Sequence, residues 1–198
     1  MPKYSAAIIS HNLWFPEFNI YLNLILQGKT VLEVNKLSDT ENILQERTPT
    51  RAKQISRILG HRVEALPESI IELYPSLDLS NQKIVDFISI MLYSKLISEF
   101  MYEVYRDELI LGDMQLNDSE IQAFLTRKQG ESEQIAGWTD QTIHRLKSAL
   151  KTFLRDTGLV TGENNGIADK VTPIFLDDRL VQLMKDEKLE YELSSLKG

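Results

Sequence analysis

One long apolar segment, from Ile84 to Leu109, limits what this chain can fold into. It is rich in Ile, Leu, Phe, Met and Tyr, so that a helix over it would be apolar on nearly every side. It also contains charged residues that would be costly in hydrocarbon, namely Asp86, Lys95, Glu99, Glu103, Arg106 and Asp107. We therefore expect the long, buried, central helix of an all-α fold and not a membrane span.

The composition is that of an ordinary globular protein. Of the 198 residues, 42% are hydrophobic and 26% are charged, which suffices for one substantial core or two small ones. The absence of cysteine excludes disulfide scaffolds and Cys-based zinc sites, and it is compatible with a reducing compartment. Residues 1–15 contain no apolar block long enough for a signal peptide. We expect a cytoplasmic protein.

Start and stop signals predict a multi-helical globular fold. The expected helices are 17–27, one from about residue 30, 50–66, 84–109, 118–128, 132–136, 139–157 and 177–191. We expect two helix-turn-helix-like units in one compact body. The first covers residues 1–75, and the second covers residues 76–198 together with the central helix.

The second unit has the order of residue types found in bacterial helix-turn-helix proteins. Ile135-Ala136 lies on a short helix, Gly137-Trp138 forms a turn, and Thr139 caps the next helix. Leu159-Val160 and Val171 to Phe175 flank a Gly/Asn-rich loop, which predicts a small β-hairpin and hence a winged variant. Many helical hairpins share this order, so a purely structural role is the alternative.

The capped helix is predicted to present a polar face to duplex DNA. Residues near its start would reach base edges, whereas bases farther along would contact phosphates. The predicted contact residues are Gln141, His144, Arg145, Ser148, Lys151 and Arg155.

A second basic helix face is predicted between residues 47 and 63. This segment holds five Arg or Lys residues and no acid, although the whole chain has a net charge of −7. Such a local excess of positive charge favours phosphate contact. The predicted contacts are Arg47, Arg51, Lys53, Arg57 and His61. Two alternatives remain: these bases solvate an exposed face, or Arg47 or Arg51 pairs with acids of the central helix.

No motif predicts catalysis, a cofactor or a bound metal. Gly28-Lys29-Thr30 ends like a phosphate-binding loop, but Asn23 stands where that motif needs its first glycine. We therefore interpret it as a helix end followed by a helix start. The three histidines, at positions 11, 61 and 144, lack neighbours at metal-ligand spacing. We expect a protein that is not an enzyme.

Across roughly residues 4 to 185, the chain resembles the BrxA family. The pattern that carries the resemblance is Tyr4-Ser5-Ala6, residues 42–48 (NILQERT) with Arg51, Ile55 and Arg62, the segment Asp86 to Asp107, and Trp138-Thr139 with Thr142, Leu146, Leu154 and Gly158. BrxA proteins are small core components of type 1 bacteriophage exclusion (BREX) systems. The resemblance implies a helical cytoplasmic protein that has helix-turn-helix units and acts beside a methyltransferase, a phosphatase-like protein and ATPases. It implies no catalytic residue.

These observations predict a non-enzymatic accessory protein of phage defence that binds double-stranded DNA as a monomer, without a cofactor or a membrane. Two alternatives stay open. One is an adaptor for other BREX proteins, because residues 64–120 hold twelve acids against three bases. The other is a helix-turn-helix transcriptional regulator, which would recognise one preferred operator and would dimerise.

Overall fold

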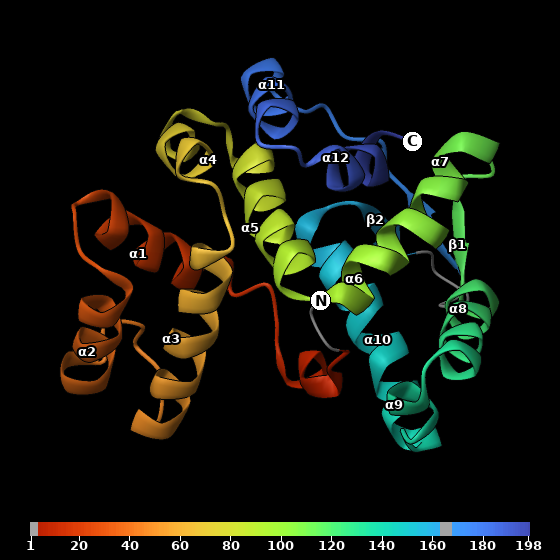
Figure 1. Ribbon diagram of the computed structural model, residues 1–198, viewed down its shortest axis with the longest axis horizontal. Helices are drawn as coiled ribbons and strands as arrows, with labels where there is room; N and C mark the ends of the chain where they lie inside the picture. The colour runs from red at the N-terminus through yellow and green to blue at the C-terminus, as the bar shows by residue number, and fades with distance from the viewer. Residues whose placement is uncertain (1–3, 163–167) are drawn as a thin grey trace. The chain divides into compact units, whose positions relative to one another are not determined.

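The protein forms two compact units in the computed structural model, which describes residues 4–162 and 168–198. The smaller unit is Trp14–Tyr93, and the larger combines Met1–Leu13 with Ser94–Gly198. Helices build both, and the larger also contains a small sheet (Figure 1). The predicted helical fold is therefore confirmed. The units divide after Tyr93, whereas the sequence suggested a division after residue 75.

The smaller unit is built from α1 to α5. Their bounds are α1 Phe15–Leu26, α2 Val31–Glu41, α3 Pro49–Glu64, α4 Glu68–Leu73, a 3₁₀ turn at Tyr74–Ser76, and α5 Leu79–Tyr93. Gly28 has a φ of 89°, a left-handed conformation that suits glycine where α1 ends. Thr30 then caps α2, with Glu33 completing a capping box. The predicted helix end and helix start at this motif are confirmed.

A buried ion pair lies in the core of the smaller unit. Arg62 on α3 is 1% exposed, and its guanidinium contacts the carboxylate of Asp86 on α5. It also donates to the Ser89 hydroxyl at 3.0 Å and lies over the Phe18 ring. The sequence placed Arg62 within the basic surface of residues 47–63, and that placement is wrong. The side chain instead connects α3 to α5.

The predicted long central helix is interrupted. Ser94 adopts an extended backbone (φ −119°, ψ 104°), so α5 ends before it and α6, Lys95–Phe100, begins after it. The helical path continues through a π-helical segment, η3 (Met101–Tyr105), into α7 (Arg106–Leu111). The prediction of a single helix over 84–109 is therefore wrong, although most of its apolar residues are buried as expected. Among the described residues, no helix has the length and apolar character to cross a bilayer.

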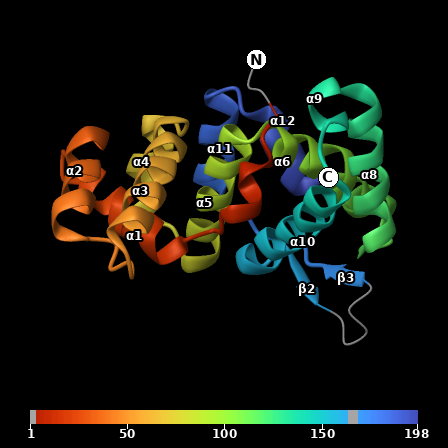
Figure 2. The same ribbon diagram turned by 90° about the horizontal axis from the view of Figure 1, so that it is seen from below.

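The larger unit contains a small sheet, two strands of which follow its longest helix, α10, in the chain. Its remaining elements are the 3₁₀ helix η1 (Ala6–Ser10), β1 Gln115–Asn117, α8 Asp118–Glu131, α9 Glu133–Ala136, α10 Asp140–Thr157, β2 Val160–Gly162, β3 Ala168–Val171, α11 Asp178–Asp186 and α12 Glu190–Lys197. Figure 2 shows β2 and β3 at one end of α10. The strands are antiparallel in the order β1-β3-β2.

Two predicted elements differ in detail from the structure. The hairpin is present as β2 and β3, which pair Val160 with Val171, but its predicted loop residues Asn164, Asn165 and Gly166 lie outside the described residues. The predicted final helix, 177–191, is two helices, because Lys188 takes a positive φ of 60° between α11 and α12.

Candidate nucleic-acid interface

The structure forms α10 as the sequence predicts. The hydroxyl of Thr139 accepts a hydrogen bond from the backbone N–H of Thr142 at 3.2 Å, which caps the helix start. Gly158 ends it with a φ of 87°. The short helix α9 precedes it, with Ile135 buried. The predicted inner stripe of α10 is buried: Ile143, Leu146, Leu150, Phe153 and Leu154.

Four predicted DNA-contact residues lie on the exposed side of α10, namely Gln141, His144, Arg145 and Ser148. Arg145 forms no ion pair within residues 4–162 and 168–198. The Ser148 hydroxyl donates to the carbonyl of His144 at 3.3 Å, so it meets a ligand chiefly as an acceptor. Arg145 is therefore the uncompensated cation of this helix face.

Lys151 and Arg155 hold the sheet against α10. Lys151 is 8% exposed, and its ammonium lies 2.6 Å from the Asp118 carboxylate of α8 and 3.4 Å from that of Asp169 on β3. Arg155 donates to Asp169 at 2.7 and 3.0 Å. Asp169 is fully buried, so it requires these partners. The prediction that Lys151 lies on the exposed face is wrong, because its charge is used within the fold.

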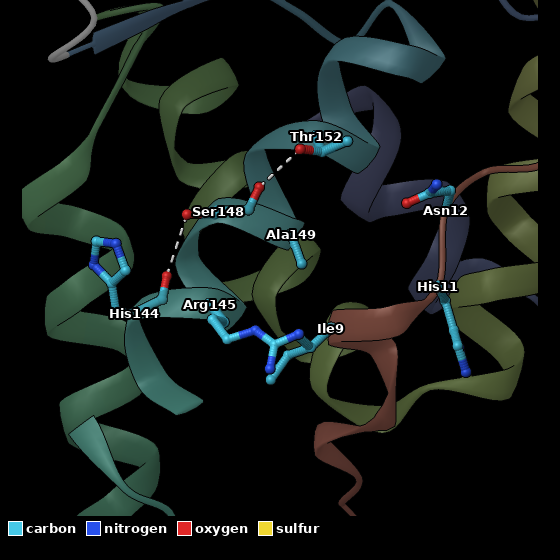
Figure 3. Close-up of a pocket in the computed structure, with 8 residues that line it drawn as sticks. All are labelled: Ile9, His11, Asn12, His144, Arg145, Ser148, Ala149 and Thr152. Atoms are coloured by element: carbon cyan, nitrogen blue, oxygen red, sulfur yellow. Dashed lines mark hydrogen bonds between the residues drawn. The ribbon is translucent and has the colours of Figure 1, made fainter. Parts of the chain in front are cut away.

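An open groove of about 400 Å³ runs beside the exposed face of α10. Its second wall is the segment at and after η1, with Ile9, His11 and Asn12 opposite the side chains of α10 (Figure 3). Figure 3 shows Arg145 extending from α10 toward Ile9. The sequence did not predict this second wall of the groove. The spacing of the histidines in the sequence did not bring His11 and His144 together, whereas both line this groove.

The second predicted face, on α3, is largely paired. Arg51 lies 3.1 Å from Glu46, Arg57 lies 2.6 Å from Asp39, and His61 lies 3.4 Å from Glu64. These carboxylates come from α2, from α3 itself and from the segment between them, and not from the α5–α7 segment that was the alternative for Arg51.

Arg47 and Lys53 complete that predicted set. Both are exposed, and neither forms an ion pair with the described part of the chain. The uncompensated charge of this face is therefore smaller than the sequence count of five bases indicated.

Comparison with known proteins identifies the family. The profile of the BrxA family matches residues 2–188, nearly the whole chain. The chain belongs to the BrxA family. It is 30% identical over 160 residues to a BREX protein BrxA of Bacillus cereus (strain H3081.97), covering 81% of this chain and 80% of that protein. Membership of the BrxA family supports a role in BREX phage defence.

Two further relatives extend this result. A BREX protein BrxA of Paramagnetospirillum magneticum (strain AMB-1) is 26% identical over 162 residues, covering 81% of this chain and 80% of that one. The crystal structure of an uncharacterized protein from Magnetospirillum magneticum superposes with a TM-score of 0.80 at 19% identity, covering 98% of both chains. At that identity, the likeness shows a shared fold.

Proposed function

We propose that this BrxA family member is a cytoplasmic, non-enzymatic protein of a BREX system that binds double-stranded DNA as a monomer, with α10 as its main contact helix. The observation that carries the proposal is the exposed, uncompensated Arg145 in the first half of α10. In a protein of net charge −7, a base without an internal partner is available for phosphate or a base edge.

The order of elements around α10 supports this assignment. A strand (β1), two helices (α8 and α9), a turn, the amphipathic helix α10 and an antiparallel hairpin follow one another, as in a winged helix-turn-helix unit. In such units, residues from the start of the second helix enter the major groove. Gln141, His144 and Arg145 occupy the corresponding first turns of α10.

In this proposal, part of a sugar-phosphate backbone enters the groove of about 400 Å³ beside α10. Arg145 and the His144 ring supply donors on one side, and the Asn12 amide supplies donors on the other. The N-terminal segment would then contact DNA together with α10. We propose Arg47, just before α3, and Lys53 on α3 as a second phosphate-binding surface, weaker because its other bases are paired.

The test is a fluorescence-anisotropy titration of a labelled duplex with the full chain at low salt. The His144→Gln/Arg145→Gln double variant should bind at least about tenfold more weakly, the size expected when one or two charge-assisted hydrogen bonds to DNA are removed. Lys185→Gln removes an exposed base from α11 and serves as the matched control. Equal affinity of the parent and the double variant would rule out α10 as the contact helix.

An adaptor that joins other BREX proteins is the alternative function. It predicts co-purification with another BREX protein that survives nuclease treatment, together with no anisotropy change on addition of duplex. Retention of that complex alongside clear duplex binding would support both roles.

A further inference from the structure

A second, acidic pocket lies in the larger unit, outside the groove beside α10. It has a volume of about 260 Å³ and is lined by η3, α7 and α8. Four of its side chains are acids, namely Glu103, Asp107, Glu108 and Glu120. Its one base, Arg127, already lies 2.8 Å from Glu103. The uncompensated charge of this pocket is negative.

Glu108 is the unsatisfied group of this pocket. Its residue is 6% exposed, and its Oε2 accepts no hydrogen bond from any described residue. The facing carboxyl belongs to Glu120, whose Oε2 accepts from the backbone N–H of Asn117 at 2.6 Å. Burial, together with Glu120, raises the pKa of Glu108 to about 7. Two carboxyl groups therefore meet at this pocket, and the backbone N–H of Gln115, which bonds Glu108, leaves its Oε2 without a donor.

A positively charged hydrogen-bond donor would satisfy both carboxylates. The pocket also has apolar walls, formed by Val104, Leu111 and Phe124, so it suits a cation on an aliphatic stem. Nowhere in residues 4–162 and 168–198 do three or more acids or histidines gather closely enough to hold a metal ion. This argues against a divalent cation and favours an ammonium or guanidinium group.

The surroundings of the pocket indicate that the cation belongs to a protein. Leu111 at its edge is 78% exposed, and the adjacent Ile110 is 54% exposed. A free small cation would leave these side chains in water, whereas a protein segment would cover them while its basic residue entered the pocket. One wall is the π-helical segment η3, a rare element found often at functional sites.

We propose that this pocket, between η3, α7 and α8, receives a lysine or arginine side chain of a partner protein whose apolar residues cover Ile110 and Leu111. A buried carboxylate gains most from such a partner, because a charge-assisted hydrogen bond is stronger away from water. The site lies on a different part of the larger unit's helices from the face of α10 proposed for DNA, and it does not depend on that proposal.

The pocket itself is tested with a small probe. The full chain, labelled with ¹⁵N, is titrated with Nα-acetyl-arginine methylamide and, separately, with the neutral citrulline analogue. We expect saturable chemical-shift changes at residues of α7 and α8 with the arginine compound and none with the citrulline analogue. The Glu108→Gln/Glu120→Gln variant should weaken this binding about tenfold, and Glu190→Gln, which alters an exposed acid elsewhere, should not. Equal shifts with both compounds, or no shifts, would overturn the pocket's assignment.

The partner is tested by crosslinking in cells. A photoreactive amino acid at Leu111 should crosslink to a protein peptide that contains Lys or Arg, and the crosslink should weaken in the Glu108→Gln/Glu120→Gln background. Crosslinks to nucleic acid, to lipid or to a second copy of this chain would overturn the proposal. So would a protein crosslink that survives the double substitution unchanged. Because DNA binding is measured separately on α10, failure here leaves that proposal intact.

Discussion

The ammonium of Lys151 on α10 lies 2.6 Å from the Asp118 carboxylate at the start of α8. This pair joins the proposed contact helix to the helix that supports it, and Lys147 reaches the same carboxylate at 3.2 Å. The pKa of Asp118 is lowered, chiefly by the hydrogen bond from Lys151. The basic residues of α10 therefore have two roles, one inside the fold and one at its surface.

Lys151→Met should lower the free energy of unfolding by about 1–3 kcal/mol, because it leaves the buried Asp169 with Arg155 as its remaining partner. Urea unfolding of the full chain measures this. Arg145→Gln, at an exposed position of the same helix, should unfold as the parent does. Equal loss of stability in both variants would contradict the separation of roles.

Arg62→Met alone should destabilise the smaller unit by about 3–5 kcal/mol, because it leaves the Asp86 charge buried without its partner. Adding Asp86→Leu should recover much of the loss, since a well-packed apolar pair replaces a buried ion pair at little cost. Thermal unfolding of the two variants decides the matter. A double variant no more stable than Arg62→Met would show that the charges themselves are needed.

Gly60→Ala tests the close packing of α3 in the smaller unit. A Cβ at Gly60 would lie 2.9 Å from both the Tyr21 hydroxyl and a Val31 methyl, so these side chains, or the helices α1 and α2 that carry them, would have to shift. We expect a loss of about 1–3 kcal/mol by overpacking. Gly130→Ala is the control, because its Cβ would meet nothing within 4 Å on α8. Equal unfolding midpoints for the two variants would refute the close approach.

The stability of the larger unit should depend on pH through Glu108. Its pKa is raised from 4.5 to about 7 by burial, by Glu120 on α8 and by Asp113 after α7. The folded state therefore binds the proton more tightly, so stability is highest below about pH 4.5 for this group and falls as the pH rises through 7. In the Glu108→Gln variant, the unfolding midpoint should change less with pH between about pH 5 and 8. An unchanged pH profile would contradict the burial of this carboxyl.

The sequence predicted the helices well where local chemistry decides them. Thr30 and Thr139 begin helices as expected, since a cap depends on its own neighbours. The interruption at Ser94 was missed, because no Gly or Pro marks it and the apolar run continues on both sides. The hydrophobicity of residues 84–109 indicated burial, but it could not indicate that the residues before Ser94 and those after it belong to different units.

The candidate site was harder to predict than the fold. An amphipathic pattern identifies the exposed side of α10, yet it cannot tell that Asp169 arrives from a strand beyond the helix and neutralises Lys151 and Arg155. Glu46 and Asp39 act in the same way on α3. The groove wall near His11 was also beyond prediction, because its residues lie more than 130 positions along the chain from the α10 residues that line the same groove. A local sequence pattern does not predict which charged residues pair across the fold.

The salt dependence of duplex binding tests the central claim most directly. The observed association constant of the parent and of the His144→Gln/Arg145→Gln variant is measured at several salt concentrations, with single-stranded DNA as a competitor. The account predicts that the log–log slope of the variant is shallower by about one unit for each phosphate that the variant no longer neutralises, with weaker binding to unrelated duplex sequences. Identical slopes and affinities for the two proteins at every salt concentration would contradict it.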